Sequence, residues 1–105
     1  MSPSGEIAVR VVVRGRVQGV GYRAFVEYEA GQLELQGWVR NRRDGTVEAL
    51  FAGPAEAVRA VRAMIEICRN GPGGSRVDAI DPREASADER AMCGGGRAFL
   101  VLPTV

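Results

Sequence analysis

The chain has 105 residues, a mass of 11.2 kDa and a formal net charge of +1, with 14 basic and 13 acidic residues. Every basic residue is arginine, because the sequence contains neither lysine nor histidine. This composition excludes imidazole general bases, Ser-His and Cys-His nucleophile pairs, and lysine Schiff bases. The length predicts one domain, and the near-neutral charge argues against a general nucleic-acid-binding protein.

Cys68 and Cys93 are the only thiol ligands in the sequence, and structural zinc usually requires four ligands. We therefore expect no metal and no cofactor. A core of this size needs no disulfide, so we expect reduced thiols and a cytoplasmic protein. The chain has no apolar run approaching the roughly 20 residues of a membrane span. Residues 1–6 do not resemble a signal peptide, and we expect them to form a flexible tail before a single domain over 7–105.

In the first half of the chain, alternating apolar residues predict a strand over 7–14. A glycine-spaced loop over 15–21 follows it. The pattern then takes a helical period, with apolar positions at Tyr22, Val26, Ala30 and Leu33. Alternation returns over 37–41, and Asp44-Gly45 predicts a hairpin into a strand over 46–52.

Pro54 suits the opening of a second helix, whose apolar face carries Val58, Val61, Ile65 and Cys68. The glycines after Asn70 end that helix. A strand over 77–85 is expected at a sheet edge, because Pro82 cannot donate to a hydrogen-bonded ladder. Residues 86–96 are predicted to be a charged loop, and residues 98–102 a short final strand.

The element order β-α-β-β-α-β, with one extra strand allowed, predicts the α+β class. We expect a ferredoxin-like split βαβ sandwich, with a four- to five-stranded antiparallel sheet and two helices on one face. The other face is expected to contact water. In this topology the first two strands run parallel, so their C-terminal ends lie at the same edge of the sheet. The loop over 15–21, the first turn of the first helix and Asn41 should therefore meet in space.

A glycine loop that leads into a helix N-terminus offers free N–H groups and the positive end of the helix dipole, which suits an anion. Arg23 lies in the first helical turn, where a cation is unfavourable unless an anion lies between the two positive groups. Asn41 has the parity of Val39, so its amide should point toward the helix-covered face. A buried amide there needs a partner, such as a water molecule beside the anion.

Each feature also has a simpler interpretation. Arg23 can be a surface arginine, Asn41 can be a turn residue beside a hairpin, and the glycines can simply form a βα turn. The segment Gly19-Val-Gly21-Tyr-Arg-Ala24 fits the dinucleotide fingerprint, but the chain is too short for a doubly wound domain. The segment Gly21–Val26 is loosely like an RNA-recognition strand motif, yet it falls on the expected helix.

Three segments together resemble the acylphosphatase family, and the resemblance extends over about residues 7–70. They are Val13-Arg-Gly-Arg-Val-Gln-Gly-Val-Gly-Tyr-Arg23, Gly37-Trp-Val-Arg-Asn41 and Asp44-Gly-Thr-Val-Glu48. The resemblance implies hydrolysis of the carboxyl-phosphate bond of acyl phosphates, without a metal or a covalent intermediate. It implies a phosphate-binding loop formed by Gly15, Arg16, Val17, Gln18, Gly19 and Val20. Arg23 would then hold the phosphate and Asn41 would position the attacking water.

The implied partners are a small-molecule acyl phosphate and the product inorganic phosphate, with no nucleic acid and no membrane, for a protein expected to be a monomer. One alternative is a non-catalytic module on the same fold that binds a small anion or regulates a partner. Another is an accessory domain like the acylphosphatase-like part of hydrogenase maturation proteins. Turnover of acyl phosphates separates the enzyme from a pure anion-binding module.

The residue at the end of the first helix and the arginines near the proposed site each allow two interpretations. Family members often have Leu-Gly-Leu near the end of the first helix, where this chain has Leu33-Glu-Leu35. A left-handed backbone costs a non-glycine residue about 1 kcal/mol, so we expect a stability cost or a different helix ending. Arginines also gather near the proposed edge, where they either steer the substrate or form a solvated rim: Arg14, Arg16, Arg40, Arg42 and Arg43.

Overall fold

The computed structural model describes residues 6–94 and 98–105. Most of the expected N-terminal tail and the end of the expected loop over 86–96 lie outside these residues. The strands are β1 (Glu6–Arg16), β2 (Gln36–Asn41), β3 (Val47–Pro54), β4 (Arg76–Glu84) and β5 (Phe99–Val101). The helices are α1 (Tyr22–Gln32), α2 (Val58–Asn70) and α3 (Ala87–Ala91), with a short 3-10 turn, η1 (Ala55–Ala57), before α2.

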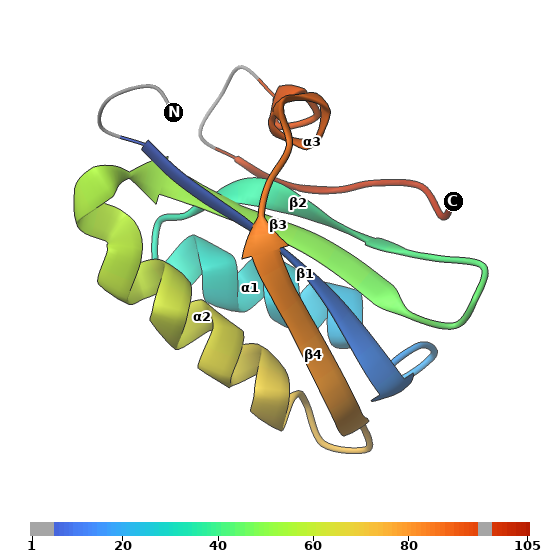
Figure 1. Ribbon diagram of the computed structural model, residues 1–105. Coiled ribbons are helices and arrows are strands. Elements are labelled where there is room, and N and C mark those ends of the chain that lie inside the picture. Colours follow the sequence, from blue (N-terminus) through green and yellow to red (C-terminus); the bar gives the residue numbers. More distant parts are fainter. Residues whose placement is uncertain (1–5, 95–97) are drawn as a thin grey trace.

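The strands form one sheet in the order β4-β1-β3-β2-β5, with α1 and α2 packed on one face (Figure 1). β3 is antiparallel to both β1 and β2, which therefore run parallel with β3 between them. β4 is an edge strand beside β1, as Pro82 indicates. β5 pairs in parallel with β2, so the sheet is mixed rather than fully antiparallel. The predicted ferredoxin-like sandwich is confirmed.

The main core lies between the sheet and the two long helices. α1 buries Tyr22, Val26 and Ala30, the three leading positions of the expected stripe. α2 buries Val61, Met64 and Cys68, whereas Ile65, expected to face inward, is only partly buried. Met64 is three residues from Val61 and four from Cys68, which places it at the centre of the buried face.

The opposite face of the sheet is not simply exposed to water, and that prediction is wrong for its centre. Trp38 and Leu50 are fully buried there in a second, smaller cluster. The segment expected to be a loop contains α3, which begins with a capping box between Ser86 and Glu89. The indole Nε1 of Trp38 donates a 3.0 Å hydrogen bond to the carbonyl oxygen of Glu89, which holds α3 on this face.

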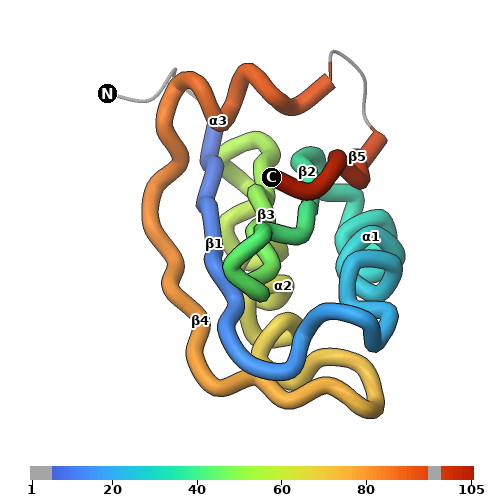
Figure 2. Tube along the Cα trace, turned by 90° about the vertical axis from the view of Figure 1, so that its right-hand side faces the viewer, coloured from blue at the N-terminus to red at the C-terminus, as the bar shows by residue number. Residues whose placement is uncertain are grey.

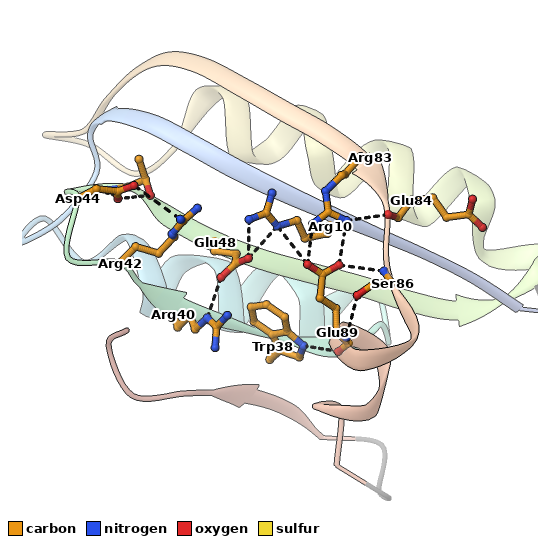
Figure 3. Close-up of polar contacts among 11 residues, drawn as sticks. Arg10, Trp38, Arg40, Arg42, Asp44, Glu48, Arg83, Glu84, Ser86 and Glu89 are labelled. Carbon is orange, nitrogen blue, oxygen red and sulfur yellow. Dashed lines mark hydrogen bonds and ion pairs between the residues drawn. The ribbon is translucent and has the colours of Figure 1, made fainter.

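A network of ion pairs surrounds Trp38 on this face (Figure 3). Glu48, with only 4% of its side chain exposed, accepts 2.7 Å hydrogen bonds from the guanidinium groups of Arg10 and Arg40. The Arg40 guanidinium also lies 4.8 Å from the centre of the Trp38 ring. Two arginines on one buried carboxylate compensate its loss of hydration. Arg40 therefore belongs to this network, on the face away from α1 and α2, and not to a rim around the proposed site.

Candidate active site

The proposed site lies where β1 passes into α1, at the same end of the sheet as the β2–β3 hairpin (Figure 1). β1 is longer than predicted and includes Gly15 and Arg16. The pairing of β1 with β4 shifts register between Arg14 and Gly15, and a Cβ at Gly15 would collide with the carbonyl oxygen of Arg76. Gly15 therefore permits close pairing of two strands at the start of the loop.

The loop proper spans residues 17–21 and ends at the N-cap of α1. Gly19 and Gly21 have left-handed backbones, with φ of 74° and 80°. A Cβ on either residue would meet nothing within 4 Å, so it is their backbone conformation that requires glycine. Gly21 is the N-cap and supplies no side-chain cap, and the first turn of α1 has no acidic residue. The free N–H groups and the positive end of the helix are thus available to an anion.

Three side chains fix the position of this loop. Val17 is buried in the main core and Val20 packs against it. The Gln18 side-chain amide donates to the carbonyl oxygens of Arg42 at 2.7 Å and Thr46 at 2.8 Å, on either side of the hairpin turn. Figure 2, which views the molecule from this end, shows the loop between β1 and α1 close to that hairpin. Gln18 therefore joins the loop to the hairpin.

The loop, α1 and the end of β2 enclose an open cleft of about 510 Å³. Arg23 and Asn41 both line it, together with the loop residues Val17 and Gly19. The split βαβ topology predicted this meeting of the loop, the first helical turn and Asn41. The other four residues of the implied phosphate loop do not line the cleft: Gly15, Arg16, Gln18 and Val20.

Arg23 is half-buried at the first turn of α1, and within the described residues it makes no ion pair. Its neighbour Tyr22 anchors that turn to α2, because the phenol donates a 2.6 Å hydrogen bond to the carbonyl oxygen of Cys68. Burial raises the pKa of Tyr22 above its usual value, so the phenol stays protonated. The guanidinium of Arg23 is therefore free to bind an anion, while its backbone is fixed.

Asn41 is the last residue of β2, and its side-chain Oδ1 is buried without a hydrogen-bond partner. Among the described residues it is the one buried side-chain oxygen or nitrogen that has no hydrogen-bond partner. Leaving such an atom unpaired costs roughly 1–3 kcal/mol, so it favours a hydrogen-bond donor from within the cleft. The backbone is fixed by Val105, whose N–H donates to the Asn41 carbonyl oxygen at 3.1 Å.

The arginines expected near the site fall into two groups. Arg14 pairs with Asp81 at 3.3 Å and Arg42 lies 3.9 Å from Asp44, so both are partly neutralised. Hydrogen bonds from Thr46 lower the pKa of Asp44 below its usual value, which keeps this carboxylate charged. Arg16 and Arg43 are exposed and have no ion pair in the part of the chain that the structure describes.

The cleft also contains residues that sequence reasoning did not find. Ala24 and Glu27 line it from α1, and Val101 lines it from β5. Glu27 follows Arg23 by four residues, one helical turn, so helical spacing could have indicated it. Across residues 6–94 and 98–105 there is no group of three or more Cys, Asp or Glu side chains suited to a metal ion. None of the described helices is long and apolar enough to cross a membrane.

Comparisons with known proteins find the same family, acylphosphatase, over nearly the whole chain. The family model named Acylphosphatase matches residues 9–93. An acylphosphatase of Rhodopseudomonas palustris (strain BisB18) is 57% identical over 99 residues, which cover 94% of this chain and 97% of the relative. The crystal structure of acylphosphatase from Bacillus subtilis has a TM-score of 0.77 and 38% identity, covering 91% of this chain and 98% of that one.

A larger protein contains a similar fold. The crystal structure of full-length HypF, in its phosphate- and nucleotide-bound form, has a TM-score of 0.76 and 26% identity to this chain. The match covers 99% of this chain but only 13% of that protein. The similarity in overall length is thus to the small acylphosphatases and not to the larger protein.

Proposed function

The chain belongs to the acylphosphatase family and hydrolyses the carboxyl-phosphate bond of acyl phosphates, and from this premise we propose which of its residues perform the reaction. The observation that carries the proposal is the meeting, in one cleft, of two groups that have no partner among the described residues: a guanidinium without an ion pair and a buried amide oxygen without a hydrogen bond. These groups belong to Arg23 and Asn41. The glycine loop over 17–21 lies beside them.

Arg23 and the loop bind the phosphoryl group. The guanidinium presents a planar fork of donors that matches two phosphoryl oxygens, and backbone N–H groups of the loop and first helical turn reach the third. The same groups stabilise the negative charge spread over these oxygens in the transition state. Gly19 and Gly21 expose backbone N–H groups to the phosphoryl oxygens. Gln18 and Val20 instead hold the loop in place, through the hairpin and the main core.

Asn41 orients the attacking water. Its Oδ1 accepts a hydrogen bond from the water, which turns a water lone pair toward phosphorus. The bond from water oxygen to phosphorus forms as the bond from phosphorus to the carboxyl oxygen breaks, and the electron pair leaves with the carboxylate. The water proton passes to a phosphoryl oxygen. A carboxylate is a good leaving group, so the step needs no histidine, no general acid and no metal ion.

We further propose that residues 7–105 act as one domain and that the protein works as a monomer in the cytoplasm. Arg23, Asn41 and the glycine loop, which carry the proposed reaction, meet within one chain, so the proposed chemistry needs no residue from a second copy. Cys68 and Cys93 are both free thiols, which suits a reducing compartment. Gel filtration coupled to light scattering tests the monomer, and a mass near that of two chains contradicts it.

Steady-state kinetics on benzoyl phosphate, with a chelator present and inorganic phosphate as competitive inhibitor, test the role of Arg23. Arg23→Ala should lower kcat/KM by about 100-fold or more, since it removes donors to the transition state. The inhibition constant for phosphate should rise as well. Arg23→Lys should recover part of the loss because it restores charge without the planar fork. Arg59→Ala, on the exposed face of α2, is the charge-matched control.

The same assay separates orientation of water from binding. Asn41→Ala should lower kcat by about 100-fold, while phosphate inhibition changes by no more than about twofold. Asn70→Ala, at the exposed end of α2, is the matched control. Substantial turnover in Asn41→Ala would overturn the assigned role. Loss of wild-type activity in the chelator would overturn the metal-independent mechanism.

A further inference from the structure

The cleft extends beyond the groups that the phosphoryl chemistry requires. Ala24 and Glu27 line it from α1, and Val101 lines it from β5. None of these side chains takes part in binding the phosphate or orienting the water. They surround the part of the cleft that remains for the acyl group of the substrate.

The position of the phosphoryl group sets the direction of the acyl group. In the proposed binding mode the phosphate lies at the N-terminus of α1, so the rest of the substrate extends along the cleft beside the helix. Glu27 lies one turn farther along α1 on the same side as Arg23. Val101 pairs with Val39, two residues before Asn41, and is 44% exposed. Glu27 and Val101 thus stand on the α1 and β5 sides of the acyl end.

The charges at the two ends of the cleft are opposite. The phosphoryl end carries Arg23 and the positive end of α1, whereas the acyl end carries the exposed carboxylate of Glu27. Within the described residues Glu27 has no ion pair, and it does not lie within ion-pair distance of Arg23. Its charge is therefore not neutralised by a neighbour, and it acts on whatever the acyl end holds.

We propose that Glu27 is a specificity-determining residue, which selects acyl phosphates with an uncharged or cationic acyl group over those whose acyl group carries a second carboxylate. Val101 and Ala24 provide apolar contact for the uncharged part of that group. The inference rests on the proposed placement of the phosphoryl group at Arg23 and the loop. The inference concerns the acyl end of the substrate, whereas the position of the phosphoryl group does not by itself indicate which acyl groups are preferred.

A charge series of benzoyl phosphates tests the inference, because the ring is rigid and only its para substituent changes. The substrates are benzoyl phosphate, para-carboxybenzoyl phosphate and para-trimethylammoniobenzoyl phosphate. Glu27→Gln should raise the ratio of kcat/KM for the anionic over the neutral substrate by about fivefold, the effect of one charge pair in a solvated cleft. The cationic-to-neutral ratio should fall by a similar factor. Glu27→Lys should change both ratios further in the same directions.

The control variant is Glu56→Gln, which removes the same charge from η1 at the opposite end of the sheet. It should leave both ratios at their wild-type values. Added salt should reduce the difference between wild type and Glu27→Gln, since the effect is electrostatic between solvated groups. A purely structural role for Glu27 would show no such salt dependence.

Three outcomes overturn the proposal. Unchanged ratios in both Glu27 variants would show that the carboxylate does not sense the acyl group. An equal fall in kcat/KM for all three substrates would show that Glu27 acts by positioning Arg23. Absence of turnover of every substrate by the wild type would overturn the proposed function together with this inference, whereas the first two outcomes leave that function standing.

Discussion

The Gln18 side-chain amide donates a 2.8 Å hydrogen bond to the carbonyl oxygen of Thr46, across the space between the phosphate loop and the β2–β3 hairpin. A second bond, of 2.7 Å, goes to the carbonyl oxygen of Arg42. The hairpin begins directly after Asn41, so one side chain links the loop beside Arg23 to the strand end that carries the amide proposed to orient the water. The distance between the proposed phosphate site and the proposed water site therefore depends on Gln18.

Gln18→Ala should weaken both the fold and the reaction. The two carbonyl oxygens keep their backbone donors, from Gly45 and Arg42, so the loss is about 1 kcal/mol for each bond removed. A loop displaced by about 1 Å should lower kcat/KM by roughly tenfold or more. Urea unfolding and benzoyl phosphate kinetics measure the two effects. Gln36→Ala, at the exposed start of β2, is the control, and equal behaviour of the two variants would refute the linking role.

Most of the fold could be predicted because its elements have clear periodicity and the hairpin has an Asp-Gly turn. The cover over Trp38 could not, because it depends on a contact between distant segments. The Ser86-x-x-Glu89 pattern was a usable signal for the start of α3. Periodicity does not indicate where α3 packs. The packing of α3 decides whether Trp38 faces water or a core.

The candidate site likewise contains residues that could be placed from the sequence and residues that could not. Arg23 and Asn41 could be placed together from the sequence. The strand order brings them to one edge of the sheet, and the alternation of side chains along β2 turns Asn41 toward the helix-covered face. The resemblance places Gln18 in the phosphate-binding loop but does not indicate that its side chain turns to the hairpin, because the orientation of a loop side chain depends on its tertiary partners. Val101 reaches the cleft through the pairing of β5 with β2, which no local pattern specifies.

Glu34 adopts a left-handed backbone, with φ of 57°, just after the end of α1. At this position family members often have glycine, and the chain keeps the left-handed conformation without the residue that favours it. Glu34→Gly should therefore stabilise the protein by about 1 kcal/mol and leave kcat unchanged. Thermal unfolding should show a higher Tm. Gln32→Gly, at the last residue of α1, should instead destabilise by up to about 1 kcal/mol, and a lower Tm for Glu34→Gly would contradict the argument.

The pairing of Glu89 with Arg83 predicts a loss of stability in acid. Hydrogen bonds from Arg83 lower the pKa of Glu89 from 4.5 to about 2. Since the pKa in the folded state lies below that of the unfolded state, the carboxylate stabilises the fold above pH 4.5. This contribution is lost as the pH falls from there toward 2.

Glu89→Gln should therefore show a weaker dependence of the free energy of unfolding on pH between about 4.5 and 2 than the wild type. Arg83→Met should shift the acid-sensitive range of Glu89 upward, because the main cause of the lowered pKa is gone. Urea unfolding, followed by the fluorescence of the single tryptophan beside Glu89, measures both curves. Identical pH profiles for the wild type and Glu89→Gln would rule out this contribution.

Arg16 and Arg43 should accelerate capture of the negatively charged substrate. Both are exposed at the end of the sheet that holds the cleft, and neither is in an ion pair among the described residues, in contrast to Arg14 and Arg42. Exposed charges act over the Debye length, about 10 Å at 0.1 M salt. The double variant Arg16→Gln, Arg43→Gln should lower kcat/KM about threefold at low salt, with little change in kcat. As salt is added, kcat/KM of the wild type should fall toward that of the double variant.

The matched control is the double variant Arg59→Gln, Arg62→Gln, which removes two exposed arginines from α2 and changes the net charge equally. If local steering operates, this control keeps most of the wild-type kcat/KM and its salt dependence, because its charges lie away from the cleft. If both double variants lose activity equally, only the net charge matters. A wild-type kcat/KM that does not change with salt would show that Arg16 and Arg43 form a solvated rim without a role in capture.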